Sequence, residues 1–395
     1  MTRLGTLITT TAAAATLALA GCGAGTSEPP APPATRSTPG APTTDQPTPD
    51  GTSAPTTVTI GATGDVLAHA PVNAGAAART GGVGYDYGPS FEAIAPRVRA
   101  ADVSLCHMET PLSPDNSNLT VPGTKVFNTP REMATALRRA GYDGCDFASN
   151  HTWDHGLDGL RGTQHVMRSA GLRYAGPSPT RSGRGAVGWH EANGLRVAHL
   201  AYSYAIINQG EPTTQAPPDA PWLHSSLWLA RGARGIRADA RAAQAQGADV
   251  VVASLHWGAE YVTAPTGQQR ELARALLRSG DVDLILGTHV HVIQPCERIA
   301  GRYVFYGLGN SLSNQSPTTS PDLRPETQEG LFVRVSLTKQ PDGTVTSRAA
   351  YLPTRVDLDG HVIEPATPQT QPETFRRTTA TLGSLGAGTC PISPA

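Results

Sequence analysis

The chain has 395 residues and a formal net charge of −1, since 31 Lys and Arg residues nearly balance 32 Asp and Glu residues. The basic residues are not clustered, and this excludes the positively charged footprint of a nucleic-acid-binding protein. Between its polar terminal segments the chain is long enough for one large domain or two small ones.

The N-terminus has the pattern of an export signal. Arg3 precedes an Ala- and Leu-rich stretch at 4–20, which is too short and too weakly apolar for a membrane-spanning helix. The stretch ends in Leu-Ala-Gly-Cys at 19–22, which resembles the bacterial lipobox, and the thiol of Cys22 can carry diacylglycerol. An ordinary secretory signal with an incidental cysteine is the alternative. We therefore predict a lipoprotein signal peptide at 1–21 and an extracytoplasmic protein anchored to the membrane by its lipid.

Two segments are rich in Pro and Thr and flank the expected domain. The segment 22–57 has almost no large apolar residue, so it cannot bury enough surface to offset its ordering entropy. We predict that it is a disordered tether between the lipid and the domain. The second segment, 360–395, is predicted to be a C-terminal tail. The folded domain is expected at 58–359.

Four cysteines remain besides Cys22, and an even number in an oxidising compartment allows two disulfides. Cys106 and Cys145 each lie in a predicted strand, which favours a bridge between them. Cys296 and Cys390 would then pin the tail to the domain. Buried free thiols are the alternative, and three connectivities are formally open.

In the first half of the domain, buried strands alternate with amphipathic helices. We predict strands at 57–67, 102–108, 145–149 and 172–175, and helices at 90–100, 129–140 and 156–170. The second helix has Thr129 as its expected N-cap, Pro130 at the first helical position and Glu132 at the third, close to a capping box.

The second half contains more antiparallel character. Alternating segments at 186–191 and 195–203 flank Ala-Asn-Gly and predict a hairpin. The other predicted elements are helices at 227–246 and 268–279, strands at 250–256, 283–286 and 302–306, and an antiparallel pair at 331–337 and 344–353. This order predicts an α/β fold with two mixed sheets packed face to face and helices outside.

The most prominent polar residues follow the carboxyl ends of predicted strands. They are Asp65, Glu109, Asn150, His151, Asp154, His256, His289 and His291. Ligands bind outside the carboxyl ends of strands in open α/β sheets, so we expect these side chains to converge on one crevice. Each residue alone has a structural alternative, such as a turn or a packed corner. Among the other histidines, His69 and His107 are expected to be neighbours of the site rather than ligands.

The chemistry of this set is that of a divalent metal site. His nitrogens together with carboxylate oxygens are typical ligands of Zn, Mn or Fe. His289 and His291 give the strongest signal, because on a regular strand residues two apart face the same side. Asn150 can offer its carbonyl oxygen to a metal, and His151 can protonate a leaving group. Two metal ions would activate water for attack on phosphorus or a carbonyl.

Six ordered blocks match one protein family. They are Thr-Gly-Asp-Val-Leu at 63–67, His-Met-Glu-Thr-Pro-Leu at 107–112, Ala-Ser-Asn-His and the following Asp-x-Gly at 148–156, Leu-His-Trp-Gly-x-Glu-Tyr at 255–261, Gly-Thr-His-Val-His-Val-x-Gln-Pro at 287–295 and Tyr-Gly-Leu-Gly-Asn at 306–310. The chain resembles the bacterial CapA-type capsule synthesis proteins, also called poly-γ-glutamate biosynthesis proteins, which look like distant relatives of calcineurin-like metallophosphoesterases. His107 stands where the family has Asn, Thr288 and Val290 replace the usual His and Pro, and the first strand lacks an Asp-x-His.

The resemblance implies a metallophosphoesterase-like sandwich of two mixed sheets flanked by helices, and a role in assembling capsule or poly-γ-glutamate. Our first hypothesis is a metal-dependent hydrolase that cleaves a phosphoester or γ-glutamyl amide bond in an envelope polymer. The expected ligands of one or two Zn, Mn or Fe ions are Asp65, Glu109, Asn150, His256, His289 and His291. His151 would act on the leaving group, and Asp154 would orient it.

The second hypothesis belongs to another class. The chain could be a non-catalytic export or assembly factor that binds the nascent anionic polymer and works with capsule-synthesis proteins of the membrane. A basic groove without bound metal would distinguish this protein from the hydrolase.

Overall fold

The computed structural model describes residues 54–181 and 185–394. Cys22, the predicted signal peptide and most of the predicted tether therefore lie outside the described residues. The first strand, β1 (Thr56–Val66), begins inside the C-terminal end of the tether segment. No helix in the described part of the chain is long and apolar enough to cross a membrane.

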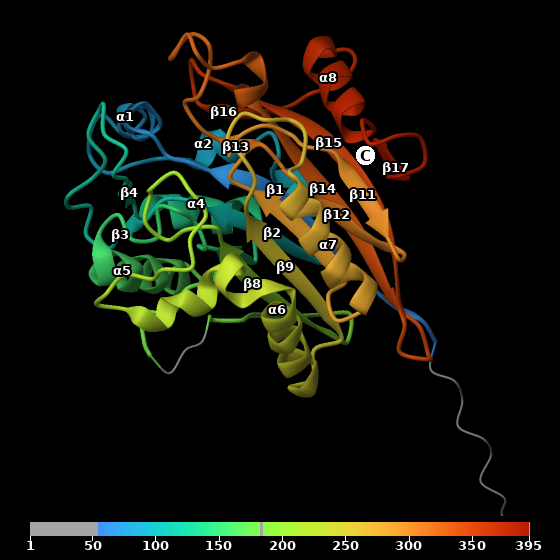
Figure 1. The fold of residues 1–395 in the computed structure, drawn as a ribbon. Coiled ribbons are helices and arrows are strands. Elements are labelled where there is room, and N and C mark those ends of the chain that lie inside the picture. The colour runs from blue at the N-terminus through green and yellow to red at the C-terminus, as the bar shows by residue number, and fades with distance from the viewer. Residues whose placement is uncertain (1–53, 182–184, 395) are drawn as a thin grey trace, which may run out of the picture. The chain divides into compact units, whose positions relative to one another are not determined.

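A nine-stranded mixed sheet forms one half of the fold (Figure 1). Its order is β16-β15-β14-β1-β2-β5-β6, with β13 paired to β1 and β17 paired to β15. Strands β1, β2, β5 and β6 run parallel, and the predicted antiparallel pairing of 331–337 with 344–353 is confirmed. The strands besides β1 are β2 (Val103–Met108), β5 (Gly144–Asp146), β6 (Arg173–Ala175), β13 (Asn310–Leu312), β14 (Glu329–Lys339), β15 (Val345–Asp357), β16 (Val362–Pro365) and β17 (Ile392–Pro394).

A six-stranded sheet forms the other half, in the order β11-β12-β10-β9-β8-β7. Its strands are β7 (Gly188–Ala192), β8 (Leu195–Ser203), β9 (Val250–His256), β10 (Leu284–Thr288), β11 (Cys296–Ile299) and β12 (Arg302–Phe305). The predicted hairpin is present, since β7 and β8 pair around Asn193 and Gly194, which have φ values of 52° and 77°. A separate two-stranded sheet joins β3 (Leu112–Ser113) to β4 (Thr129–Pro130).

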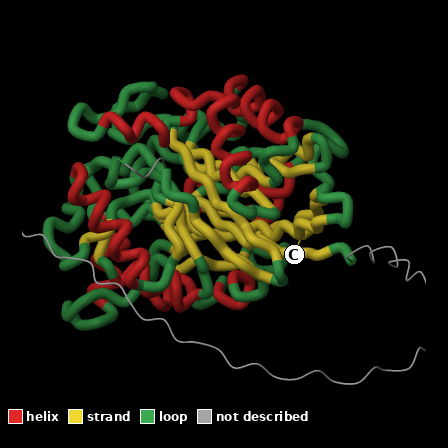
Figure 2. The backbone as a smooth tube through the Cα atoms, turned by 90° about the horizontal axis from the view of Figure 1, so that it is seen from below, coloured by secondary structure: helices red, strands yellow, loops and turns green. Residues whose placement is uncertain are grey.

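Helices cover the outer face of each sheet, and strands lie between them (Figure 2). The first sheet carries α1 (Ala70–Ala78), α2 (Gly88–Phe91), α3 (Ala95–Val98), α4 (Glu132–Ala140) and α5 (Gly156–Ser169). The second carries α6 (Trp228–Ala245) and α7 (Gly267–Ser279), and the remaining helices are α8 (Pro372–Leu382) and the 3-10 helices η1 (Pro221–Ser226) and η2 (Pro325–Gln328).

The alternation of side chains along the strands produces this layering. In β9, Val250 and Val252 enter the core between the sheets, where they share a cluster with Leu105 of β2. Val251, between them, faces outward and packs in a cluster with Leu276 of α7. The predicted α/β fold with two mixed sheets packed face to face and helices outside is confirmed.

The helix predicted at 129–140 is shorter than expected. Its first two residues form β4, and α4 begins at Glu132. The backbone N–H of Thr129 donates to the carbonyl of Pro111 (2.8 Å), and its hydroxyl bonds the hydroxyl of Thr110 (2.7 Å). The prediction of Thr129 as N-cap is wrong, because Thr129 lies in β4 and its N–H and hydroxyl bond to the segment that leads into β3, while Arg131 is the N-cap of α4.

The helix predicted at 90–100 is divided into the short helices α2 and α3. Pro96 lies in the middle of this range and has no backbone N–H to donate to the preceding turn. The apolar spacing was therefore correct, but the proline prevents one continuous helix.

Both predicted disulfides, Cys106–Cys145 and Cys296–Cys390, are present. The first joins β2 to β5, and the second joins the start of β11 to the C-terminal segment. In that segment β16 and β17 pair with β15, and Arg377 of α8 forms an ion pair with the buried carboxylate of Glu329. The described part of this segment, 360–394, thus contains strands and a helix that pack on the first sheet.

We predict that replacing both Cys296 and Cys390 by Ser lowers the free energy of unfolding by about 2–4 kcal/mol, because the bridge closes a long loop in the unfolded chain. Chemical denaturation followed by circular dichroism measures the change. An unaltered midpoint would show that non-covalent contacts alone hold the C-terminal segment.

Candidate metal centre

The carboxyl ends of β1, β2 and β5 in one sheet lie near those of β9 and β10 in the other. Polar residues at these ends converge, as expected from the sequence. The structure brings together Asp65, Glu109, Asn150, His151, His256, His289 and His291, all of them buried. Asp154 is half-buried and hydrogen-bonded to His151.

Asp65 is the carboxylate at the centre of this cluster and is fully buried. Both of its oxygens accept from the backbone N–H of His289, at 3.3 and 3.2 Å. One oxygen lies 3.2 Å from Nδ1 of His291. The backbone before Asp65 packs closely against that of Gly309. Only glycine fits at position 64, because a Cβ there would lie 1.9 Å from the carbonyl oxygen of Gly309.

Glu109 and His291 form the next pair. Both carboxylate oxygens of Glu109 are buried without a hydrogen-bond partner, and Oε1 lies 3.6 Å from Nε2 of His291. Burial raises the pKa of Glu109 to about 7, although the nearby His291 opposes the shift. Burial alone would lower the pKa of His291, but Glu109 and Asp65 raise it to about 10. Asp65, Glu109 and His291 form one group that can hold a cation.

His289 and His291 do not lie on a regular strand, so the reason given for their common direction is wrong. Strand β10 ends at Thr288, and the two histidines adopt left-handed backbone conformations with φ values of 91° and 56°. Such values are rare outside glycine and are concentrated at functional sites. The turn still brings His289, His291 and Glu260 into a second group that can hold a metal.

Asn150 and His256 contact each other directly. Oδ1 of Asn150 lies 2.8 Å from Nε2 of His256, which fits donation by the ring N–H. The hydroxyl of Thr288, 3.0 Å from Nδ1, is then the donor on the other side of the ring. Burial lowers the pKa of His256 well below its ordinary value, which favours the neutral ring, and a metal would replace one of these two hydrogen bonds.

His151 and Asp154 form a separate pair at the edge of the cluster. Nδ1 of His151 lies 2.8 Å from Oδ2 of Asp154, and the same oxygen accepts from the backbone N–H of Phe127 at 2.7 Å. The ring of Phe127 packs edge-on against His151, with centroids 4.6 Å apart. Asp154 therefore fixes the orientation of the His151 ring.

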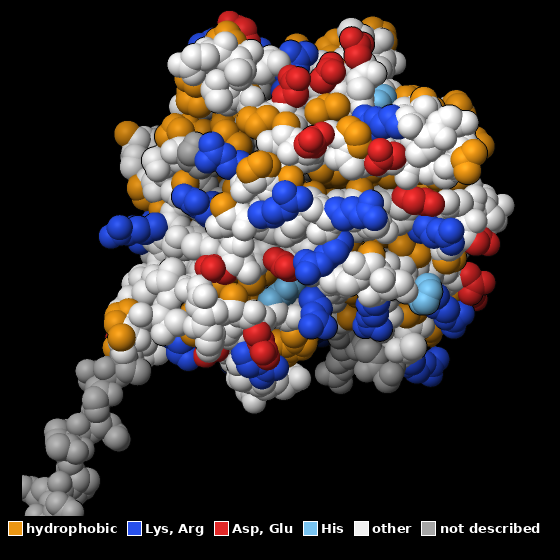
Figure 3. All heavy atoms as spheres, turned by 180° about the vertical axis from the view of Figure 1, so that it is seen from behind, with side chains coloured by type: hydrophobic (Ala, Val, Ile, Leu, Met, Phe, Trp, Pro, Cys, Tyr) orange, Lys and Arg blue, Asp and Glu red, His pale blue; other side chains and the backbone are white. Residues whose placement is uncertain are grey.

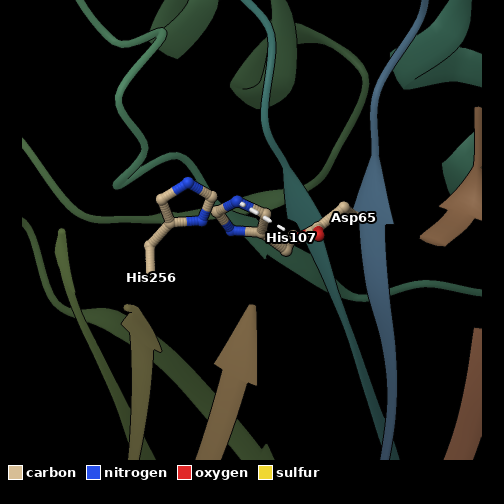
Figure 4. Close-up of side chains that lie close together, drawn as sticks. All are labelled: Asp65, His107 and His256. Carbon is tan, nitrogen blue, oxygen red and sulfur yellow. Dashed lines mark ion pairs between the residues drawn. The ribbon is translucent and has the colours of Figure 1, made fainter. Parts of the chain in front are cut away.

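Two residues of the centre were not predicted as ligands, His107 and Glu260. His107 was expected only as a neighbour, but it forms a third group with Asp65 and His256, and its ring stacks on that of His256 at 4.8 Å (Figure 4). Burial would lower the pKa of His107, but Asp146 raises it to about 9. Its position near the carboxyl end of β2, two residues before Glu109, was the available signal.

The side chains fit a divalent cation. Both oxygens of Glu109, Nε2 of His107 and Nδ1 of His289 are buried polar atoms without partners among the described residues. Such atoms are costly unless an additional group satisfies them. The donors are imidazole nitrogens and carboxylate oxygens, which suit Zn, Mn or Fe. The group of Asp65, Glu109 and His291 shares Asp65 with one of the other two groups and His291 with the other, so the three groups describe one connected centre.

Comparison with known proteins gives relatives for most of the domain. The sequence model of the family "Bacterial capsule synthesis protein PGA_cap" matches residues 59–315. The chain is 28% identical over 241 residues to "Capsule biosynthesis protein CapA" of Bacillus anthracis and 26% identical over 233 residues to "PGA biosynthesis protein CapA" of Bacillus subtilis (strain 168). These matches cover 60% and 59% of this chain but only 56% and 58% of the relatives' lengths.

Solved structures show weaker similarity. A phosphatase from Mycoplasma pneumoniae has a TM-score of 0.42 at 14% identity, with 81% of this chain and 98% of that chain covered. The calcineurin-like phosphoesterase YfkN from Bacillus subtilis has a TM-score of 0.40 at 16% identity, with 82% and 98% covered.

We predict that His291→Ala and His256→Ala each lower the affinity for a loaded divalent metal by at least about tenfold, since each removes a donor nitrogen. Elemental analysis after metal loading and gel filtration measures the content. The matched control is His165→Ala on the exposed side of α5. Full metal content in both variants would contradict the ligand assignment.

Proposed function

The chain belongs to the family of the bacterial capsule synthesis protein PGA_cap, and we propose that it is a metal-dependent hydrolase of a cell-envelope polymer. The bond cleaved is a phosphoester or a γ-glutamyl amide. The observation that carries this proposal is the fully buried carboxylate of Glu109, which has no hydrogen-bond partner and faces Asp65 and His291. Burying a carboxylate without a partner is costly, and a bound cation would offset that cost.

The residues have separate roles in the proposed reaction. Asp65, Glu109, Asn150, His256, His289 and His291 would hold one or two Zn, Mn or Fe ions. A bound ion would lower the pKa of a water molecule and polarise the phosphoryl or carbonyl oxygen at the bond that is cleaved. Nδ1 of His151 is bonded to Asp154, which leaves Nε2 as the atom that, in the protonated ring, would give a proton to the leaving group.

The proposed location narrows the choice of substrate. A lipid on Cys22 would keep the domain outside the cytoplasm, where no nucleotide pool is available. Two relatives carry names that refer to the synthesis of capsule and PGA. An anionic envelope polymer such as poly-γ-glutamate is therefore the proposed substrate, and membrane proteins of capsule synthesis are the proposed partners.

A second candidate function is polymer binding, because the structure contains an arginine-lined cavity. The cavity measures about 860 Å³ and lies at the amino-terminal ends of β2 and β6, opposite to the metal centre. Arg138, Arg168 and Arg173 line it together with acidic residues. Two of these acids have local partners: Asp102 accepts from Thr59 and Asp143 from Ser104.

The surface charge limits the length of anionic polymer that the protein could bind. On the face shown in Figure 3, Lys and Arg side chains run across the molecule with Asp and Glu side chains among them. This surface is mixed in sign and lacks a long, uniformly basic groove. The cavity would hold a short anionic segment, whereas the metal centre would carry the chemistry.

For the hydrolase, we predict that His151→Ala lowers kcat by about 10²–10⁴-fold while metal content stays unchanged, because a general acid is lost and no ligand is. The assay uses the metal-loaded mature protein and a panel of phosphoester and γ-glutamyl substrates, with His165→Ala as control. If the wild-type protein held no metal under any loading condition, the proposal of a metal-dependent hydrolase would be refuted.

For the second candidate, we predict that the double variant Arg168→Ala/Arg173→Ala weakens binding of poly-γ-glutamate by about tenfold or more, since each charge-assisted hydrogen bond contributes about 1.5–3 kcal/mol. Calorimetric titration at several salt concentrations measures the affinity. Arg161→Ala, an exposed residue outside the cavity, is the control. Equal affinity in all three proteins would exclude the cavity as the binding place.

A further inference from the structure

The loop that follows β8 forms one side of the metal centre. It spans 204–220, between β8 and η1, and begins with Tyr204. The backbone N–H of Tyr204 donates to the carbonyl of His256 at 2.9 Å, which continues the parallel pairing of β8 with β9 by one residue. Further along the loop, Oδ1 of Asn208 accepts from Nδ2 of Asn150 at 3.2 Å. The loop is therefore bonded to two of the proposed ligands, His256 and Asn150.

The ring of Tyr204 lies against the histidines of the centre. Its centroid is 4.2 Å from that of His289 and 6.0 Å from that of His256. Burial raises the pKa of the Tyr204 hydroxyl, and the nearby carboxylates of Glu260 and Glu109 raise it further. Both carboxylates belong to groups that can hold a cation. The phenol of Tyr204 therefore lies beside the proposed ligands.

The hydroxyl of Tyr204 has no hydrogen-bond partner among the described residues. Tyrosine hydroxyls usually find a partner when they are buried. The other buried tyrosines each have one, namely Tyr87, Tyr142, Tyr174, Tyr202, Tyr303, Tyr306 and Tyr351. Tyr204 is only 2% exposed, yet its oxygen remains accessible to a water molecule. It is therefore a free and accessible donor at the centre.

A purely structural tyrosine at this position would not need its hydroxyl, because phenylalanine would pack the same ring against His289. Tyr202, two residues earlier on β8, illustrates the structural case. Its hydroxyl donates to Oδ2 of Asp239 on α6 at 3.0 Å. The hydroxyl of Tyr204 is instead available to a molecule bound at the centre.

The proposed reaction needs a donor of this kind. When water attacks a phosphoester or an amide, negative charge develops on the phosphoryl or carbonyl oxygen, and donors that are already in place stabilise it. The charged groups that act most strongly on Glu109 and His289 are other histidines and Asp65, and neither Lys nor Arg is among them. A phenol keeps its proton near neutral pH, because its ordinary pKa is about 10. It can therefore donate to that oxygen.

We propose that the hydroxyl of Tyr204 binds the substrate oxygen on which negative charge develops, as a hydrogen-bond donor beside the metal centre. This inference rests on the proposed function and adds a catalytic residue to it. The proton stays on the phenol, so Tyr204 neither attacks the substrate nor replaces His151 as the proton donor. The group that Tyr204 recognises is an oxyanion, on phosphorus or on the carbon of a carbonyl under attack.

The experiment compares the wild type with Tyr204→Phe, which removes only the hydroxyl. Both proteins are loaded with Mn²⁺, and calorimetric titration measures their affinities for inorganic phosphate and for acetohydroxamate. We expect the variant to bind at least one probe about tenfold more weakly, since one hydrogen bond to a charged group is lost. Loss of affinity for phosphate alone assigns the phosphoryl oxygen, and loss for acetohydroxamate alone assigns the carbonyl oxygen.

Turnover of the phosphoester and γ-glutamyl panel gives a second measurement. In Tyr204→Phe, kcat should fall by about 10²–10³-fold, the usual effect of removing one such donor. KM should change much less, because the lost hydrogen bond is strongest in the transition state. Elemental analysis should find the same metal content in both proteins.

Tyr202→Phe is the matched control, since it removes a phenol hydroxyl of the same strand that faces Asp239. It should lower the temperature of unfolding and leave the affinity for both probes unchanged. Tyr204→Phe should unfold at the wild-type temperature, because no hydrogen bond within the protein is lost. A Tyr204→Phe protein that is destabilised, or that loses metal, would show that the phenol supports the ligands and would overturn the proposal.

The remaining outcomes separate this inference from the proposed function. If the wild type holds no metal, the proposed function is overturned and the role of Tyr204 falls with it. If the metal-loaded wild type and Tyr204→Phe have equal affinities for both probes and equal kcat, only the role of Tyr204 is overturned. A metal-loaded wild type that binds neither probe has the same consequence, and the metal centre stands.

Discussion

The buried carboxylate of Asp65 is the interaction on which the rest of the centre depends. It lies near the carboxyl end of β1 in one sheet, accepts from the backbone of His289 in the loop that follows β10 of the other sheet, and faces His107 and His291. A carboxylate removed from water is costly unless donors or cations surround it. The two sheets therefore meet here through polar contacts, whereas elsewhere they meet through an apolar core.

The space between the two sheets is thus divided into an apolar core, which stabilises the fold, and a polar end, which forms the candidate metal centre. Between the sheets, β1, β2, β9 and β10 supply one apolar cluster, which includes Ile60, Leu105, Val252 and Leu284. Toward the carboxyl ends of β2, β5 and β9, the inward positions become polar at His107, Asp146 and Ser254. The unpartnered atoms of Glu109 and His289 lie at this end, and a bound cation would offset the cost of burying them.

Periodicity and local motifs predicted much of the fold, because the inward and outward positions of β2 or β9 are already visible as alternating residues. They also placed Asp65, Glu109, His256 and His289 at strand ends. They missed His107 as a ligand candidate, since its direction depends on the register of β2 and β5 and on Asp146, which is distant in sequence. The left-handed backbone at His289 and His291 also depends on tertiary contacts that no local pattern records.

The most direct test of this account is a crystal structure of the metal-loaded protein, with anomalous diffraction collected at the absorption edge of the bound metal. The account predicts anomalous density between Asp65, Glu109 and His291. Density elsewhere, or none between these side chains in a protein shown to carry metal, would contradict it.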